Sequence, residues 1–522
     1  MTSKTGENII LWEDVLFAFK DASCIQRDGT ILSFLRDEDL KILEPHQFRA
    51  YPDEVLDIVI KPPVYKSNAE PSRSDHVRIP SPIHSITSAV EKLTISIPTS
   101  NDLDSIYNAG VSYYDGRDIE KNYSKAVEYF LQAAEQGHAG AQSYLGYLYQ
   151  EGEGVAKDYA KAVEWYQKAA DQGNAAAQSN MGNIYYDGMG VTRDYSTALE
   201  WFLKAANQDN PIAQGWVARS FFSGHGVTQD YAKALEWYQK SAEHGVAISQ
   251  ECLADMYYNG HGTAKDYSNA AKWYEKAAEQ GDATSQYMMG YLYQNEMGVP
   301  QDYRKAVEFY RMAADNGNIN GHNELGHMYE HAKGVQQDYP MAFKCYKKAA
   351  NMGKASAQNN VGSMYFEGRG VPKDYSNAFI WFLKAANQDN AIAQEWLGKM
   401  YYCGYGVTQS FLKAFEWYSR AAFQETATSQ EILGNMYFSG KEIDRDYCAA
   451  LLWFTKAANQ GEDNSQYMLG LIYQEGLDVP PNHSLAVEWY EKAARQGHVL
   501  AMERLSKMRR ESARSSGGTK LK

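Results

Sequence analysis

The chain has 522 residues, which is too long for a single ordinary globular core, so we expect either several domains or a repeat array. Its formal net charge of -14 argues against nucleic acid and against membrane surfaces as partners, because phosphate binding requires clustered lysine and arginine side chains. The 5 cysteines are far apart and form no CxxC pair, so they predict neither a disulfide framework nor a zinc site.

The N-terminal part of the chain has its own pattern. It begins with an apolar amphipathic segment and continues through an Asp28-Gly29 turn to a strand-like run at residues 55–60. We therefore predict a small α/β module of unknown role over residues 1–60. Prolines and serines are frequent in residues 61–102, which predicts a flexible linker.

Targeting signals are not evident in the sequence. Residues 1–8 lack the basic and apolar pattern of a secretory signal, and no run of about eighteen apolar residues occurs. Residues 519–522 form neither a prenylation box nor an ER-retention signal. We therefore expect a cytoplasmic protein without membrane insertion.

A period of 36 residues dominates the chain from residue 103 to residue 508, which predicts a repeat array. A small residue recurs at this interval at Gly110, Gly146, Gly182, Ala218, Ala254, Gly290, Gly326, Gly362, Gly398, Gly434 and Gly470. An aromatic residue recurs at Tyr123, Tyr159, Tyr195, Tyr231, Tyr267, Tyr303, Tyr339, Tyr375, Phe411 and Tyr447, and His483 takes the eleventh slot. The pattern predicts eleven repeats in register.

The unit from residue 174 to residue 209 illustrates the physical basis of the repeat. Asn174 is a suitable N-cap for a first helix, and Asp194 for a second amphipathic helix. Gly182 lies inside the first helix, where glycine costs roughly 0.5 to 1 kcal/mol relative to alanine. Because close packing explains a cost that recurs in most units, we predict that Gly182 and its counterparts touch the backbone of a neighbouring helix.

These repeats resemble the Sel1-like family, a branch of the tetratricopeptide-like helical repeats. The family pattern includes Ala-x-Ala-Gln, Leu-Gly-x-x-Tyr, Gly-x-Gly-Val, Asp-Tyr-x-Lys-Ala and Trp-Tyr-x-Lys-Ala-Ala. The segment from Gly137 to Gly173 matches it at Ala139, Ala141, Gln142, Leu145, Gly146, Tyr149, Gly152, Gly154, Val155, Asp158, Tyr159, Lys161, Ala162, Trp165, Tyr166, Lys168, Ala169, Ala170 and Gln172. The resemblance implies an all-α fold, a right-handed α-α superhelix (solenoid) of about eleven 36-residue helical hairpins over residues 103–508. After it we expect a disordered basic tail at residues 509–522.

A longer period is also present. The sequence WFLKAANQDN occupies residues 201–210 and returns at residues 381–390, displaced by 180 residues, which is five repeats. SQYMMGYLYQ at residues 285–294 returns in similar form at residues 465–474. We infer that a five-repeat block was duplicated, and we hypothesise two similar binding surfaces.

Several patterns suggest chemistry and have a structural alternative. His327 and His331 have the i, i+4 spacing of metal ligands, but His327 occupies a variable slot, so we interpret it as a surface position and predict no metal site. The glycine-rich loops lack the GxxxxGK[ST] pattern, and we interpret them as turns. The Trp-Tyr pairs suggest base-stacking platforms, but their strict period favours the core. We predict no catalytic residue and no cofactor.

Slots that vary between repeats are candidates for partner binding. The slot after the small residue holds Tyr147, Asn183, Arg219, Asp255, Tyr291, His327, Ser363, Lys399, Asn435 and Leu471. The slot one turn earlier holds Ser143, Ser179, Glu251, Tyr287, Asn323, Asn359, Glu395, Glu431 and Tyr467. We predict that this double ladder lines the concave face that the resemblance implies and recognises the partner, although free drift of solvated positions explains the variation equally well.

The leading hypothesis for function is a non-catalytic scaffold or adaptor that binds other proteins on this concave face. The resemblance implies assembly roles, such as substrate adaptors of ER-associated ubiquitin ligases and regulators of chitin synthase. The alternative is a signalling or regulatory protein whose N-terminal module carries the activity and whose repeats localise it. A third possibility is a structural oligomerisation unit.

Overall fold

The computed structural model describes residues 24–31, 56–59, 102–116, 119–441 and 443–517. The chain divides into two units, residues 1–92 and residues 93–522, which we describe separately. In the first unit, β1 (Cys24–Ile31) pairs antiparallel with β2 (Leu56–Val59). The expected amphipathic segment and residues 61–101 of the expected linker lie outside the described residues.

The Asp28-Gly29 pair does not form a turn in this unit. Both residues lie within β1, at a shift of strand register between Arg27 and Thr30. β2 falls inside the strand-like run at residues 55–60. The Asp-Gly pair thus forms an irregularity within a longer strand, where a turn was predicted.

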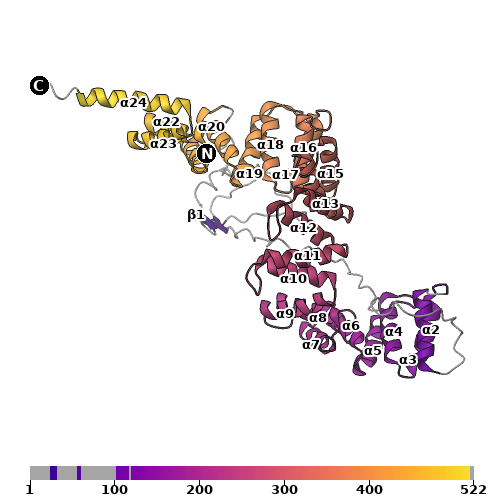
Figure 1. Ribbon diagram of the computed structural model, residues 1–522. Helices are drawn as coiled ribbons and strands as arrows, with labels where there is room; N and C mark the ends of the chain where they lie inside the picture. Colours follow the sequence, from indigo (N-terminus) through magenta and orange to yellow (C-terminus); the bar gives the residue numbers. More distant parts are fainter. Residues whose placement is uncertain (1–23, 32–55, 60–101, 117–118, 442, 518–522) are drawn as a thin grey trace, which may run out of the picture. The chain divides into compact units, whose positions relative to one another are not determined.

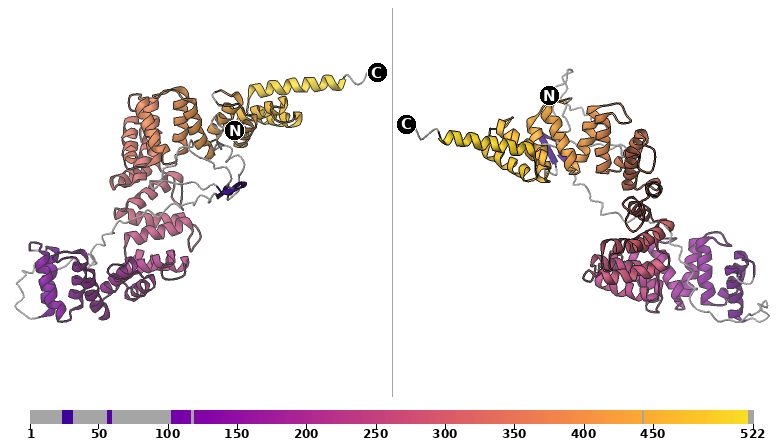
Figure 2. Two further views of the ribbon diagram at one scale, coloured as in Figure 1. Left: turned by 180° about the vertical axis from the view of Figure 1, so that it is seen from behind. Right: turned by 45° about the horizontal axis from the view of Figure 1, so that its top comes forward.

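The second unit is a solenoid of consecutive helical hairpins, as the repeat period predicts. Each second helix packs on its own first helix and on the first helix of the next hairpin. The first helices are α2 (Leu103–Asp115), α4 (Ala139–Glu151), α6 (Ala175–Asp187), α8 (Pro211–Ser223), α10 (Ala247–Asn259), α12 (Ala283–Asn295), α14 (Ile319–Glu330), α16 (Ala355–Glu367), α18 (Ala391–Cys403), α20 (Ala427–Ser439) and α22 (Asp463–Glu475). Figures 1 and 2 show the hairpins following one another in chain order.

The second helices complete the eleven hairpins. They are α3 (Tyr123–Glu135), α5 (Tyr159–Asp171), α7 (Tyr195–Ala206), α9 (Tyr231–Glu243), α11 (Tyr267–Glu279), α13 (Tyr303–Asp315), α15 (Tyr339–Asn351), α17 (Tyr375–Ala386), α19 (Phe411–Phe423), α21 (Tyr447–Asn459) and α23 (His483–Arg495). A last helix, α24 (Val499–Gly517), packs on α23 in the place of a twelfth first helix. Among the described residues, none of the helices has the length and apolar character that crossing a bilayer requires.

Helix α24 differs from the disordered tail expected from residue 509 onward. The helix continues through residue 517, because the sequence after Arg509 contains no proline or glycine before Gly517 to interrupt it. Leu505 and Ala501 of this helix are buried against α23, which anchors its first half. The sequence reading missed this helix because its second half lacks an apolar stripe.

The caps of the worked unit are confirmed. The Asn174 side chain accepts a hydrogen bond from the backbone N–H of Ala177 at the start of α6. The Asp194 carboxylate accepts from the backbone N–H groups of Ser196 and Thr197 at the start of α7. These bonds satisfy donors that the first turn of a helix leaves unpaired.

The glycine inside nine of the eleven first helices packs against a ring, so the prediction that it touches a helix backbone is wrong. A Cβ atom added to Gly182 would lie 2.4 Å from Cε1 of Phe202, on the second helix of the same hairpin. The same relationship recurs in the pairs Gly110–Phe130, Gly146–Tyr166, Gly290–Tyr310, Gly326–Tyr346, Gly362–Phe382, Gly398–Tyr418, Gly434–Phe454 and Gly470–Tyr490. In these nine hairpins an aromatic ring therefore fills the space that the missing side chain leaves, whereas α8 and α10 have Ala218 and Ala254 at this slot.

Candidate functional site

The predicted ladder residues lie one on each of the first helices from α4 to α22. Arg219, Asp255, Lys399 and Asn435 are exposed, whereas Asn183 is buried. The remaining ladder residues, Tyr147, Tyr291, His327, Ser363 and Leu471, are partly buried. The ladder therefore combines exposed, partly buried and buried positions. Its exposed charged side chains are Arg219, Asp255 and Lys399.

The slot one turn earlier is less accessible than the sequence suggested. Ser143, Ser179, Asn323 and Asn359 are buried. The partly exposed members of this slot are Glu251, Tyr287, Glu395, Glu431 and Tyr467. Small polar residues at this slot thus belong to the packing, and the larger ones reach the surface.

Two ladder residues belong to a duplicated cluster of aromatic rings and a cation. The Arg219 guanidinium lies 5.2 Å from the ring centroid of Trp216 and 5.8 Å from that of Tyr186. At positions displaced by 180 residues, the Lys399 ammonium lies 4.7 Å from the Trp396 ring and 5.9 Å from the Phe366 ring. In both clusters the Trp ring stacks on a buried Phe, Trp216 on Phe202 and Trp396 on Phe382. The five-repeat duplication therefore extends to a three-dimensional arrangement of side chains.

Three carboxylates on the first helices are held in desolvated surroundings. Burial raises the pKa of Glu395 and of Glu431, although a hydrogen bond from a serine hydroxyl opposes the shift in each case. The pKa of Asp255 is raised as well, because the protein atoms around its carboxylate exclude water from it although part of the side chain is exposed. This carboxylate accepts a hydrogen bond from the Tyr274 hydroxyl. A charged group whose pKa is raised in this way gains from a cation brought beside it.

A set of buried glutamine side chains ties the repeats together, and the sequence reading missed it. In the repeat that starts at residue 175, Gln178 Nε2 donates to the Ala170 carbonyl of the preceding second helix at 3.1 Å. Gln208 Nε2 then donates to Gln178 Oε1 at 2.7 Å. We call such a doubly bonded side chain a staple. The signal was visible in the sequence as a glutamine followed by another amide 30 residues later.

Eight repeats contain this staple. Their buried glutamines are Gln142, Gln178, Gln250, Gln286, Gln358, Gln394, Gln430 and Gln466, each donating to the carbonyl eight residues earlier. Their amide donors are Gln172, Gln208, Gln280, Asn316, Gln388, Gln424, Gln460 and Gln496. Each of these carbonyls also accepts a hydrogen bond from the backbone N–H three residues later, as Ala170 does from Gly173. A carbonyl oxygen has two lone pairs, so the glutamine adds a second hydrogen bond, one that joins two repeats.

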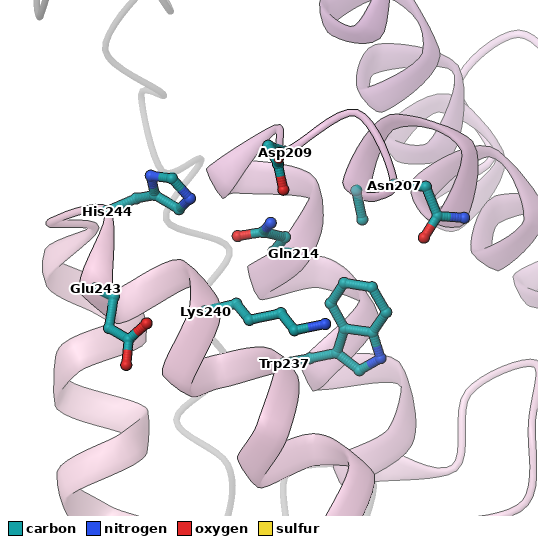
Figure 3. Close-up of a pocket in the computed structure, with 8 residues that line it drawn as sticks. Asn207, Asp209, Gln214, Trp237, Lys240, Glu243 and His244 are labelled. Atoms are coloured by element: carbon teal, nitrogen blue, oxygen red, sulfur yellow. The ribbon is translucent and has the colours of Figure 1, made fainter.

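Two further repeats lack the complete staple. In the repeat 211–246 the glutamine is present as Gln214, but His244 replaces its amide donor. In the repeat 319–354 the two slots hold His322 and Met352. The lining residues of one surface cavity include Gln214 and His244 (Figure 3).

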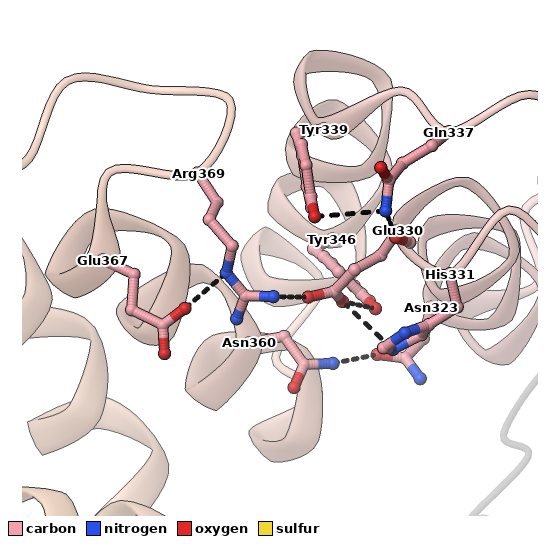
Figure 4. A network of polar contacts seen from close by, with 9 residues as sticks. All are labelled: Asn323, Glu330, His331, Gln337, Tyr339, Tyr346, Asn360, Glu367 and Arg369. Carbon is pink, nitrogen blue, oxygen red and sulfur yellow. Dashed lines mark hydrogen bonds and ion pairs between the residues drawn. The ribbon is translucent and has the colours of Figure 1, made fainter.

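A second polar cluster joins α14 to the loop that follows α16 (Figure 4). Glu330 is nearly buried, accepts a hydrogen bond from the Tyr346 hydroxyl at 2.7 Å and pairs with Arg369 at 2.6 Å. In other repeats the slot of Glu330 holds a glutamine that accepts from the equivalent tyrosine, as Gln150 does from Tyr166. The charge of Glu330 is thus matched by a cation that the next repeat supplies.

The histidine pair lies at the end of α14. The rings of His327 and His331 lie 4.4 Å apart between centroids. Burial and the neighbouring His331 lower the pKa of His327. Within the part of the chain that the structure describes, no group of three metal-binding side chains occurs.

The Trp-Tyr pairs divide into a core residue and a surface residue. Their tyrosines are buried, which confirms the core interpretation: Tyr166, Tyr238, Tyr274, Tyr418 and Tyr490. The preceding tryptophans are partly buried, and each lies under the cation three residues later, as Trp165 lies 4.0 Å from Lys168 Nζ. The tryptophans therefore lie at the surface of the second helices, where a neighbouring cation covers part of each ring through a cation–π contact.

Comparison with known proteins agrees with this architecture. The family model described as Sel1 repeat matches residues 103–138, 139–174, 175–210, 211–246, 248–282, 283–318, 319–354, 355–390, 391–422, 427–462 and 463–498. A search of curated protein sequences found no significant match.

Two solved structures share both sequence and fold with this chain. A protective antigen of uropathogenic Escherichia coli that displays an SLR fold is 34% identical, with a TM-score of 0.72, over 78% of this chain and 88% of that one. A Sel1 repeat protein from Oxalobacter formigenes is 30% identical, with a TM-score of 0.50, over 59% of this chain and 90% of that one. Because the matched segments cover most of the chain, the protein belongs to the Sel1 repeat family.

Proposed function

We propose that this protein is a non-catalytic scaffold that binds protein partners along the surface of its first helices. Solenoids of this type are typically used for protein–protein interaction, because stacked repeats present one long continuous surface. The observation that carries the proposal is the duplicated cluster around Arg219 and Lys399. Tryptophan, tyrosine and arginine are the residues that most often dominate the energy of protein interfaces.

The charge of the surface favours a partner segment that contains basic residues. Glu395 and Glu431 have raised pKa values because burial disfavours their charged forms. Lysine or arginine side chains of a partner would offset this cost at both sites. The net charge of -14 adds a long-range attraction for such a partner, which salt would screen.

The duplication supports binding at two places along one chain. Trp216 and Trp396 stack on their phenylalanines with ring centroids 5.3 Å and 5.4 Å apart, and their interplanar angles are 3° and 6°. Two clusters with the same geometry can engage two similar segments of one partner. Linked segments gain affinity because the second binding step becomes intramolecular.

The test uses charge reversal at the two clusters in the full chain. Partners are captured by proximity labelling in the native cell and identified by mass spectrometry, and the strongest is then titrated by calorimetry. We expect R219E and K399E each to weaken binding about tenfold or more, because each variant removes the cation that lies over the Trp216 or the Trp396 ring and so breaks up the cluster, and we expect the double variant to abolish binding. Unchanged affinity of the double variant would remove the ladder from the proposal.

The matched control reverses two lysines of the second helices that are also displaced by 180 residues. Lys204 and Lys384 are exposed and lie over Trp201 and Trp381. We expect K204E/K384E to bind the partner as the wild type does. The two-site arrangement would be overturned by two results together. They are a calorimetric stoichiometry of one site, and complete loss of that site in R219E alone or in K399E alone.

A further inference from the structure

One buried acceptor in the repeat array lacks the donor that its counterparts have. Gln214 is 1% exposed, and its Oε1 atom has no hydrogen-bond partner among the described residues. In all eight stapled repeats the equivalent oxygen accepts from an amide 30 residues later, as Gln394 Oε1 accepts from Gln424 Nε2 at 2.8 Å. A buried oxygen without a partner is costly, so binding of a donor that the described part of the chain does not supply would be favourable here.

Gln214 and His244, the residue in the donor's slot, both line one cavity. The cavity has a volume of about 350 Å³, which exceeds the volume of a glutamine side chain. Its polar and aromatic lining consists of Asn207, Asp209, Gln214, Trp237, Lys240, Glu243 and His244. Figure 3 shows the Gln214 amide above the Lys240 side chain, which extends toward the Trp237 ring, while the exposed His244 stands to one side.

The charges around the cavity select the chemistry of the ligand. A carboxylate has no proton to donate to Gln214 Oε1 at neutral pH, and it would approach Asp209 and Glu243. An ammonium group would meet Lys240, whose Nζ atom lies 4.2 Å from the Trp237 ring centroid. A primary carboxamide is neutral, donates through its NH₂ group to the orphaned oxygen and offers its own oxygen to the Lys240 side.

We propose that the cavity beside Gln214 is a binding site for a primary carboxamide, such as a glutamine or asparagine side chain of a partner. The ligand takes the place that Gln424 occupies beside Gln394 in the duplicated block. The site involves α7, α8 and α9 and is separate from the ladder of the first helices. The experiment that tests this site is therefore independent of the one that tests the proposed scaffold surface.

The chain provides its own matched variants. H244Q introduces the side chain found at this slot in most stapled repeats, so it should donate to Gln214 internally and close the site. Q424H makes the reverse change in the second block, where Gln394 would lose its donor. Because each variant copies a residue already present at the equivalent position, both should fold, and circular dichroism checks this.

The experiment is a ¹⁹F NMR titration of the full chain labelled with 5-fluorotryptophan. The probe is N-acetyl-glutamine-N-methylamide, and the Trp237 and Trp417 signals are assigned with single Trp→Phe variants. We expect a saturable shift of the Trp237 signal in the wild type, its loss in H244Q and a new shift of the Trp417 signal in Q424H. N-acetyl-glutamate-N-methylamide should leave both signals unmoved.

Four results would overturn the proposal. The first three are an unmoved Trp237 signal in the wild type, an equal shift in H244Q and an equal shift with the glutamate probe. A Trp417 signal that stays unmoved in folded Q424H would overturn it too, because the missing donor would then not create the site. A parallel titration with free L-glutamine distinguishes the sources, since tighter binding of the free amino acid would assign the site to it rather than to a peptide side chain.

Discussion

The backbone of Gly182 lies against the ring of Phe202, so closely that a Cβ atom on the glycine would come within 2.4 Å of the ring. Both residues are fully or nearly fully buried, one on each helix of the same hairpin. The interior of the solenoid is thus built from repeated contacts between a missing side chain and an aromatic ring. The stability of each hairpin depends on keeping this slot small.

The first prediction concerns this contact. G182A should lower the free energy of unfolding by about 1 kcal/mol, because the overpacking of the ring exceeds the gain in helix propensity. G182V should cost about 2 kcal/mol or more, because the larger side chain displaces the ring further. Urea denaturation followed by circular dichroism measures both effects. A stabilised G182A, which helix propensity alone predicts, would contradict the role of the contact.

The second prediction compares two glutamines at the same slot. Q178A should destabilise the protein by about 1–2 kcal/mol, because it removes two hydrogen bonds, the one from Gln178 Nε2 to the Ala170 carbonyl and the one from Gln208 Nε2 to Gln178 Oε1. Q214A should cost less, because Gln214 Oε1 has no bond to lose within the described structure. The measured quantity is the shift of the urea midpoint. Equal losses in the two variants would show that the side chains stabilise through packing alone.

The repeat period made the hairpins and their caps predictable, but it did not predict contacts between residues that are far apart in the sequence. Asn174 and Asp194 were predicted as caps because a cap depends on residues within its own first turn. The bond between Gln172 and Gln142 joins residues 30 positions apart, and the staple also reaches the previous repeat, so helical periodicity does not reveal it. The predicted contact partner of Gly182 was wrong for the same reason. The spacing of the glycines shows that space is needed at this slot, but it does not show which side chain occupies that space.

The ladder shows a second limit of the sequence. Variation between repeats correctly indicated exposed positions at Arg219 and Lys399, because solvent imposes no fixed residue type. It failed at Ser143 and Asn359, which vary although they are buried. Small polar residues can replace one another in a tight contact between helices, so variation alone does not distinguish such a contact from a surface.

The third prediction concerns the ion pair between Glu330 and Arg369. R369A should destabilise the protein by about 1–2 kcal/mol, because it leaves a nearly buried carboxylate with the Tyr346 hydroxyl and the more distant His331 as its remaining partners. E330Q should be close to neutral, because glutamine accepts the equivalent tyrosine bond in other repeats. The double variant R369A/E330Q should recover most of the loss. A double-mutant cycle with thermal unfolding measures the coupling, and additive effects would contradict the pairing.

The last prediction concerns pH and His322, which occupies the glutamine slot of the staple. Burial, together with the charge of Lys348, lowers the pKa of His322 below its ordinary value. The unfolded chain therefore binds a proton more readily than the folded chain, so stability is lost as the pH falls through about 6.5 toward the folded pKa. H322Q removes this titration and places an amide where it can donate to the Ala314 carbonyl, as the glutamines of the stapled repeats do.

The wild type should therefore lose more thermal stability than H322Q between about pH 7.5 and about pH 5.5. The two proteins share all other titrating groups, so the difference between their Tm profiles isolates this position. H327N is the matched control, because burial also lowers the pKa of His327, on the same helix but outside the staple. H327N should reduce the acid sensitivity without the gain at neutral pH that a restored hydrogen bond gives H322Q. Parallel Tm profiles for the wild type and H322Q would contradict the prediction. They would show that the His322 imidazole binds a proton as readily in the folded chain as in the unfolded chain.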